Sequence, residues 1–386
     1  MGRTVKAATR VQRCRAQFRG MKSLLRPHIE RFLRRLPVSP IPVSPIAFDE
    51  RDAAERLSTI SQLEAYDVHR LEEVVPLIRS PQERIRITAL CRDADVLPRV
   101  VDAGAVVQQE DGTFAQIMHN GVRVLAGGYC GSWMQNLITR CRGVHEPQEE
   151  VAFAEIMKHL ADDATMIELG AYWSYYSIWF LTRGLGRRAI AVEPDPAHLE
   201  VGRTNARLNA CEPQFVQAFV GRRSAPPSKF KTVDSGEVEL PCTSLPDLVE
   251  SHAVEHVDLL HCDAQGLELD ILESCQDLAA AGRLGWVVVS THSHHITGDP
   301  LTHQRCLALL ARAGAAILAE HDVQESFSGD GLIVAKFGLV PKSWQTPKLS
   351  YNRYSESLFR NPLYDLASAG HKARASPANS ATKALR

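Results

Sequence analysis

The second half of the chain alternates between short apolar runs and segments with helical periodicity. Near the end of this half, apolar runs indicate strands at Ala316–Glu320 and Leu332–Phe337. Alternation of this kind is typical of a parallel sheet that is covered by helices on both faces. We therefore predict an α/β, Rossmann-like, doubly wound domain with a mostly parallel sheet over residues 146–340. Its other strands are expected at Thr165–Leu169, Ala189–Val192, Phe215–Val220, Val257–Cys262 and Trp286–Ser290, and its helices at Tyr175–Thr182, Ala197–Asn209, from Leu267 and at Leu301–Ala313.

A different pattern precedes this domain. Residues 47–104 carry apolar side chains at helical spacing, and three short strands and a helix around Trp133–Thr139 follow. The strands are separated by Asp111-Gly112 and Asn120-Gly121, dipeptides that tolerate the positive φ of tight hairpins. Residues 47–145 are therefore expected to form a small α+β extension, a cap or substrate domain. The three strands are Val106–Gln109, Phe114–Met118 and Val122–Leu125.

Both ends of the chain differ in composition from its centre. Residues 1–36 hold eleven Lys and Arg against a single acid, Glu30, and a Pro-rich linker follows up to residue 46. Residues 21–36 could make a weak membrane-surface or partner contact. The alternative is an extension without such a role, with translation starting at Met21, and it is the interpretation we favour. Residues 341–386 are rich in Ser, Asn, Pro and Ala and predict a disordered tail.

Overall charge and cysteine content narrow the class of protein. The 386 residues have a formal net charge of −1, so we expect no nucleic-acid partner. Nine cysteines without a CxxC pair argue for free, mostly buried thiols and against disulfides or a structural zinc site. The sequence shows neither a long apolar run nor a secretory signal, which favours a cytoplasmic protein.

Candidate chemistry lies where the first two predicted strands of the sheet end. Gly170 follows the first strand, and Glu193 ends the second strand a little over twenty residues later. In a doubly wound sheet this glycine lets the backbone approach a nucleotide, and the acid accepts hydrogen bonds from the ribose hydroxyls. The loop between Gly170 and Ser174 lacks the three glycines that hold a pyrophosphate, and it carries Tyr172 and Trp173 instead. Acidic and aromatic side chains can attract the positively charged sulfonium of S-adenosylmethionine (SAM). The loop therefore suits SAM better than it suits NAD.

These segments resemble the FkbM-type methyltransferases. The resemblance rests on Glu168-Leu-Gly-Ala171, Tyr175-Tyr-Ser177, Ala191-Val-Glu-Pro-Asp195 and the segment from Asp258 to Glu268, and it spans residues 165–337. It implies a class I methyltransferase fold and a SAM-dependent O-methyltransferase that acts on sugars or other secondary metabolites. By position, Glu168, Gly170 and Ala171 would line the methionine end of SAM, Glu193 would bind the ribose and Asp263 would lie at the reaction centre. The chain departs from the family at several positions: Ser174 replaces a glycine, Tyr172 a small polar residue and Gln265 a Glu, and His261 stands where Lys is common.

Three residues are candidates for the proton acceptor. Asp263 ends the fourth strand, His292 follows the fifth strand on the same edge, and His145 precedes a helix that would pack beside the first strand. Pro147, Glu149 and Glu150 also satisfy the preferences of a helix start, which explains them without a role in catalysis. His292 and His294 could share a face and bind a metal, but without a third ligand we predict no metal site.

The sequence thus predicts methyl transfer from SAM to a hydroxyl of a small molecule, with Tyr172 as a further cofactor contact. Two alternatives stay open at this point. One is a non-catalytic module with the SAM-binding fold, and the other is an NAD-type oxidoreductase, against which the missing glycines count.

Overall fold

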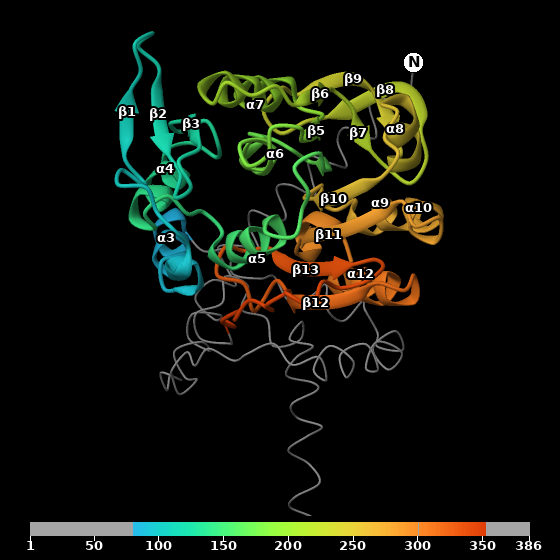
Figure 1. Cartoon of the computed structure of the whole chain (residues 1–386). Helices are drawn as coiled ribbons and strands as arrows, with labels where there is room; N and C mark the ends of the chain where they lie inside the picture. The colour runs from blue at the N-terminus through green and yellow to red at the C-terminus, as the bar shows by residue number, and fades with distance from the viewer. Residues whose placement is uncertain (1–79, 300, 353–386) are drawn as a thin grey trace, which may run out of the picture. The chain divides into compact units, whose positions relative to one another are not determined.

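A seven-stranded sheet forms the centre of the computed structural model, which describes residues 80–299 and 301–352 (Figure 1). Its strand order is β12-β13-β11-β10-β4-β5-β6. All of its neighbouring strands are parallel except at β13, which runs antiparallel to both β11 and β12. The predicted doubly wound, mostly parallel sheet is confirmed. Its strands are β4 (Thr165–Leu169), β5 (Arg188–Val192), β6 (Gln214–Val216), β10 (Val257–Cys262), β11 (Leu284–Thr291), β12 (Ala316–His321) and β13 (Gly331–Lys336).

Helices cover both faces of this sheet because successive strand residues point in opposite directions. Leu259 packs into one apolar core and its neighbour Leu260 packs into the other. The first core contains apolar residues of α5 (Pro147–Met157), α6 (Tyr175–Leu181) and α7 (Pro196–Leu208). The second core contains apolar residues of α8 (Leu245–Ser251), α9 (Glu268–Ser274), α10 (Gln276–Ala280) and α12 (Thr302–Arg312). The buried strands thus read as nearly continuous apolar runs, as the sequence pattern indicated.

The N-terminal extension packs against the first of these two layers. Met118 and Leu137 share an apolar core with Phe153 of α5. The buried Asn205 of α7 accepts a hydrogen bond from the backbone N–H of Leu125 at 2.6 Å, which ties the extension to this helix. The elements of the extension are α3 (Pro81–Thr88), η2 (Asp93–Val96), β1 (Val106–Gln108), β2 (Phe114–Ile117), β3 (Arg123–Leu125) and α4 (Ser132–Arg140).

Helical structure in the extension is less continuous than expected. Residues 97–104 contain no helix, so the expectation of helices up to residue 104 is wrong there, while residues 47–79 lie outside the described part. The predicted basic segment and Pro-rich linker, residues 1–46, also lie outside it. The three strands occur as predicted and form an antiparallel sheet, which projects as a hairpin in Figure 1.

A second small sheet lies beside the ends of β5 and β6 and was not predicted. It consists of β7 (Phe219–Val220), β9 (Glu237–Thr243) and β8 (Ala225–Lys231), of which β8 and β9 form an antiparallel hairpin. Its turn is fixed to the main sheet, because the carboxylate of Asp195 accepts hydrogen bonds from the backbone N–H groups of Asp234 (2.8 Å) and Ser235 (3.1 Å).

The segment after β13 is packed rather than free up to residue 352. Leu349 is fully buried, and the carbonyl oxygen of Ser350 accepts a hydrogen bond from the side-chain amide of Gln148 on α5 at 2.7 Å. Ser350 also donates its backbone N–H to Asp93 at 2.7 Å. The expectation of a disordered tail from residue 341 is therefore wrong for residues 341–352, and the rest of that tail lies outside the described residues.

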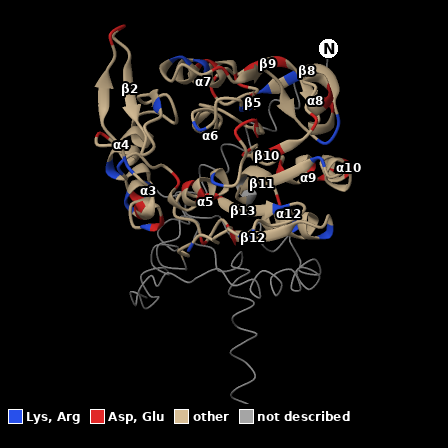
Figure 2. Ribbon diagram, viewed as in Figure 1, with Lys and Arg blue, Asp and Glu red and all other residues tan. Residues whose placement is uncertain are grey.

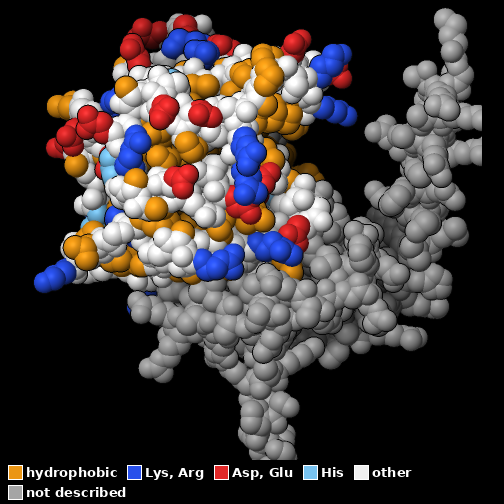
Figure 3. All heavy atoms as spheres, turned by 90° about the vertical axis from the view of Figure 1, so that its right-hand side faces the viewer, with side chains coloured by type: hydrophobic (Ala, Val, Ile, Leu, Met, Phe, Trp, Pro, Cys, Tyr) orange, Lys and Arg blue, Asp and Glu red, His pale blue; other side chains and the backbone are white. Residues whose placement is uncertain are grey.

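Charges lie mainly on the outer helices and loops, while acidic residues also occur along α5 in the middle of the molecule (Figure 2). The face shown in Figure 3 mixes both signs of charge with apolar and neutral side chains. Within the described residues the cysteines are free and mostly buried, and no helix is long and apolar enough to cross a bilayer.

Candidate active site

A cavity of about 400 Å³ opens at the carboxyl ends of β4, β5 and β10. It lies where the strand order reverses between β4 and β10, which is the place where open α/β sheets bind ligands. All five predicted cofactor-binding residues line it, as do His145 and Asp263. His292 does not line it. The five residues are Glu168, Gly170, Ala171, Tyr172 and Glu193.

The loop after β4 turns sharply around Gly170. Gly170 has a φ of +80°, and a Cβ at this position would lie 1.8 Å from the carbonyl oxygen of Asp263. Tyr172 and Ser174 also have positive φ values, of 39° and 56°. Glycine at residue 170 is thus required for β4 and β10 to end side by side. Ser174 has a left-handed backbone conformation, which glycine adopts more readily than serine.

Glu193 is held at the end of β5 by backbone donors. Its carboxylate accepts hydrogen bonds from the N–H of Tyr172 (3.0 Å) and the N–H of Asp195 (2.9 Å). His198 lies 3.4 Å from it and stacks on the Tyr172 ring at a centroid distance of 3.5 Å. Because a carboxylate has about four lone-pair positions and three donors already face it, Glu193 can still accept a bond from a ribose hydroxyl.

Aromatic and acidic side chains form the wall between the loop and α5. Tyr129 of the extension stacks on Trp173 with a centroid distance of 4.5 Å, and both line the cavity. Glu168 lies beneath them and accepts a hydrogen bond from the backbone N–H of Ser177 at 3.0 Å. Burial raises the pKa of Glu168 to about 7. A wall of this composition attracts a cation by charge and by the faces of the rings.

The start of α5 places a histidine between two carboxylates at the cavity. His145 Nδ1 lies 2.6 Å from Glu150 Oε1, and its Nε2 lies 3.2 Å from Glu146 Oε2. Burial alone would lower the pKa of His145, but Glu146 and Glu150 together raise it to about 10. Burial raises the pKa of Glu146 to about 7, in spite of the neighbouring His145. His145 is therefore an imidazolium near neutral pH and cannot accept a proton, which argues against the predicted role as a base.

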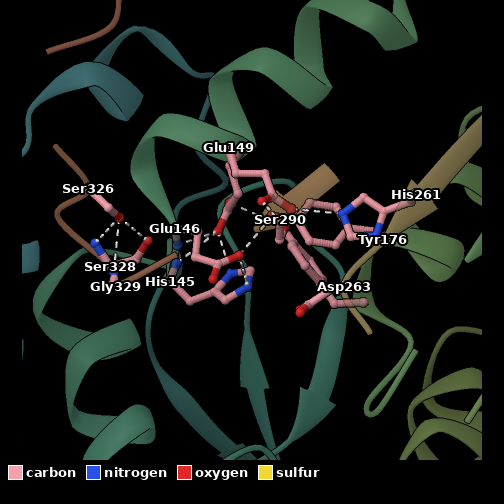
Figure 4. Close-up of polar contacts among 12 residues, drawn as sticks. His145, Glu146, Glu149, Tyr176, His261, Asp263, Ser290, Ser326, Ser328 and Gly329 are labelled. Atoms are coloured by element: carbon pink, nitrogen blue, oxygen red, sulfur yellow. Dashed lines mark hydrogen bonds and ion pairs between the residues drawn. The ribbon is translucent and has the colours of Figure 1, made fainter. Parts of the chain in front are cut away.

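A second histidine–carboxylate pair links α5 to β10 (Figure 4). His261 Nε2 lies 2.7 Å from Glu149 Oε1, and Ser290 donates its hydroxyl to the other Glu149 oxygen at 2.6 Å. His261 is only 1% exposed and lines the cavity, and its Nδ1 has no hydrogen-bond partner among the described residues. Glu149 and Glu150 lie in the first turn of α5, as the interpretation of a helix start expects, and both are in addition buried partners of histidines.

Asp263 faces the cavity from the end of β10, with His292 behind it. His292 Nε2 lies 3.1 Å from Asp263 Oδ1, and its Nδ1 lies 2.6 Å from Glu268 Oε1. Burial opposes the charged form of His292, but Asp330, Asp263 and Glu268 raise its pKa well above the usual value. The geometry argues against the predicted role of His292 as a base, because both ring nitrogens face carboxylates and the ring does not line the cavity. In this position His292 contacts Asp263 from the side away from the cavity.

The strand that would place His292 and His294 on one face ends before both residues. β11 ends at Thr291 and α11 (His294–Thr297) begins at His294, so the alternation of a strand does not continue through these residues. No group of three or more His, Cys, Asp and Glu side chains within residues 80–299 and 301–352 is arranged to hold a metal ion.

The cavity suits SAM in shape and charge. Glu193 can bind a ribose, Gly170 permits close approach of the backbone, and Glu168 presents negative charge to the cationic end of the cofactor. The fold and the cavity together define a Rossmann-like class I methyltransferase that uses SAM. Residues 152–316 match the model of the Methyltransferase FkbM domain. The dehydrogenase alternative is thereby set aside.

Several solved structures are similar to the chain, and no curated protein sequence matches it. Precorrin-6y C5,15-methyltransferase from Geobacter metallireducens has 17% identity and a TM-score of 0.34, over 49% of this chain and 88% of that one. The METTL16 methyltransferase domain has 16% identity and a TM-score of 0.33, over 50% and 69%. TrmK from M. capricolum, in complex with S-adenosylhomocysteine, has 11% identity and a TM-score of 0.32, over 50% and 71%.

Four further residues of this site were not among the predicted site residues. Glu146 and His261 line the cavity, Glu149 contacts His261, and Ser290 donates a hydrogen bond to Glu149. The signals for His261 were its place two residues before Asp263 in a largely apolar strand and the Lys that is common at this position in the family it resembles. A histidine on a buried strand needs a polar partner, and that partner lies on a helix more than a hundred residues earlier in the chain.

Proposed function

We propose that this methyltransferase methylates a hydroxyl group of a small molecule, of the sugar or secondary-metabolite type. SAM supplies an electrophilic methyl group on a positively charged sulfur. One observation carries the proposal: a single cavity is lined by Gly170 and Glu193, which are placed to hold the nucleoside, and by two further carboxylates, Glu146 and Asp263. An O-methyltransferase needs such a group, because the hydroxyl must lose its proton as its oxygen is methylated.

Glu146 is the better proton acceptor of the two carboxylates. A general base works best when its pKa lies near the working pH, and burial brings the pKa of Glu146 to about 7. The Tyr176 hydroxyl lies 3.3 Å from Glu146 Oε2 and fixes the position of the carboxylate. Asp263, which His292 holds from behind, is placed to accept a hydrogen bond from the acceptor hydroxyl and to align its oxygen.

The wall formed by Tyr129 and Trp173 supports a small acceptor rather than a macromolecule. The Tyr129 and Trp173 rings stack on each other, and Trp173 also contacts His145. The two rings therefore close one side of the cavity and exclude water from it. A volume of about 400 Å³ must also hold the cofactor, which leaves room for a small group beside it.

The substrate class can be tested with SAM that carries a ¹³C-labelled methyl group. The purified full chain is incubated with pools of hydroxylated, aminated and thiol-containing small molecules, and separately with transfer RNA. We expect label only in the hydroxylated pool, with the carbon shift of a methyl ether. Label on nitrogen, on sulfur or on RNA would contradict the proposal, and Glu193→Gln should lose the reaction together with SAM affinity.

The proton acceptor can then be tested with the identified substrate. Glu146→Gln should lower kcat about 100-fold and remove the rise of kcat with pH near 7, while affinity for S-adenosylhomocysteine is kept. Glu155→Gln is a matched control, because Glu155 lies on the same helix but pairs with Lys158 and His159 outside the cavity. An unchanged pH profile in Glu146→Gln would assign the proton to another group.

A further inference from the structure

His261 is a buried donor that faces the cavity without a partner. Its ring is 1% exposed and lines the cavity between Tyr176 and Asp263. Nε2 is taken by Glu149 at 2.7 Å, whereas Nδ1 has no hydrogen-bond partner within the described residues. A buried polar group without a partner is costly in a folded protein, and a group that faces a cavity is usually completed by what binds there.

The partners of His261 favour its positively charged form. Burial opposes the charge, but Glu149, Glu168 and Asp263 raise the pKa of His261 above its usual value. Ser290 holds the second oxygen of Glu149 at 2.6 Å, so the carboxylate cannot turn away from the ring. As an imidazolium, His261 has a proton on Nδ1, and its complement is an oxygen with negative charge.

Only one part of SAM carries such an oxygen, the carboxylate of its methionine end. The cavity floor around His261 is otherwise acidic, with Glu146, Glu168 and Asp263. These groups attract the ammonium and the sulfonium of SAM but repel its carboxylate. His261 also pairs in register with Glu168, so a cationic and an anionic side chain stand next to each other on β10 and β4.

We propose that His261 binds the carboxylate of SAM through Nδ1, with Glu149 and Ser290 as positioning residues behind it. Glu168 beside it takes the ammonium group of the same methionine end. This inference rests on SAM as the cofactor and is independent of the acceptor. Other cationic groups that line the cavity in the described residues are less suitable. His145 and His198 use both ring nitrogens on carboxylates, and Lys231 lies on β8, in the wall formed by the hairpin.

The test compares SAM with decarboxylated SAM, which keeps the sulfonium and the ammonium but lacks the carboxylate. Affinities are measured by titration calorimetry on the full chain. Wild-type protein should bind SAM about 10- to 100-fold more tightly than the decarboxylated compound, as expected for one hydrogen bond between charged groups. His261→Gln keeps a side-chain nitrogen near the position of Nε2 but none near Nδ1, so it should bind both compounds with similar affinity.

Two variants control for folding and for general charge. His261→Asn keeps a donor near the position of Nδ1 and should retain part of the preference for SAM. Lys231→Ala removes a positive charge from the wall of the same cavity, and the ratio of the two affinities should stay at the wild-type value. Loss of the preference in Lys231→Ala, with the preference intact in His261→Gln, would overturn the proposal.

The unaltered protein provides an independent measurement. In ¹⁵N-histidine spectra, Nδ1 of His261 should shift when S-adenosylhomocysteine binds and should stay in place when 5′-methylthioadenosine, which lacks the amino acid, binds. A wild-type protein that binds SAM and decarboxylated SAM equally would refute the role of His261 and leave the cofactor assignment intact. A protein that binds neither SAM nor S-adenosylhomocysteine would refute the cofactor assignment itself.

Discussion

Gly170 and Asp263 meet backbone to backbone at the ends of two neighbouring strands. A Cβ on Gly170 would lie 1.8 Å from the carbonyl oxygen of Asp263, a distance at which the two strand ends must separate. The backbone N–H of Asp263 also donates to the carbonyl oxygen of Leu169 at 2.8 Å. The glycine thus joins the nucleotide side of the cavity to its acceptor side, and both should fail when it is replaced.

Gly170→Ala should therefore lower the free energy of unfolding by about 2–5 kcal/mol. About 1–2 kcal/mol comes from the left-handed backbone and about 1–3 kcal/mol from the clash. Gly314→Ala is the matched control, because Gly314 has a φ of +89° and no atom near its Cβ position, so only the backbone term applies. Denaturant unfolding measures the free energy of unfolding of both variants. Equal losses in the two variants would show that the close approach of β4 and β10 has no energetic weight.

Ser174 gives a prediction of the opposite sign. It occupies a left-handed position with a φ of 56°, and its hydroxyl is buried without a hydrogen-bond partner in the described residues. Ser174→Gly removes both costs and should stabilise the protein by about 1 kcal/mol. Ser177→Ala is a useful comparison, because it removes another buried hydroxyl without a partner but leaves a helical backbone unchanged. A lower unfolding midpoint for Ser174→Gly would mean that the hydroxyl has a partner in solution.

The sequence was most informative where local pattern determines structure. The apolar runs at Thr165–Leu169 and Val257–Cys262 match β4 and β10 residue for residue, because buried parallel strands are apolar on both faces. The hairpin of β8 and β9 was missed because β8 is largely exposed, contains Pro226 and Pro227 and shows no alternation. The positions of Gly170 and Glu193 at the ends of β4 and β5 follow from the fold alone.

Pairs of residues that are distant in the chain could not be predicted. Glu149 satisfies the ordinary preferences of a helix start, and only the packing of α5 on the sheet brings it to His261. The orientation of His292 depends in the same way on α9, which carries Glu268. Local sequence places these residues on elements, but the contacts depend on how those elements pack.

Asp195 fixes the β8–β9 hairpin at the rim of the cavity and can be tested by hydrogen exchange. Its carboxylate caps α7 through the N–H of Ala197 and accepts bonds from Asp234 and Ser235. These bonds hold the pKa of Asp195 well below its usual value in spite of some burial. Asp195→Ala should cost about 2–4 kcal/mol and speed exchange of the Asp234 and Ser235 amides. Ser235→Ala removes one side-chain bond to Asp195 and should leave those two amides protected.

The free energy of unfolding depends on pH with the same sign at two neighbouring groups just before α5, His145 and Glu146. Glu146 and His145 both bind a proton more tightly in the folded chain, with pKa values of about 7 and about 10 against usual values of 4.5 and 6.5. The folded state therefore holds more protons, and stability falls as pH rises. For Glu146 the fall lies between about 4.5 and 7, and for His145 between about 6.5 and 10.

His145 should accordingly stay protonated far above its usual pKa. Glu146 and Glu150 face it from α5, and the rings of Tyr129, Trp173 and Tyr175 close the other sides and exclude water. The stability that it contributes is fully present below about pH 6.5 and is lost as pH rises toward 10, with a slope of about 1.4 kcal/mol per pH unit. Labelled-histidine NMR, with His145→Gln for assignment, should show imidazolium shifts at pH 8. A titration midpoint below pH 8 would mean that the two carboxylates do not hold the charge, and His145 would then return as a candidate base.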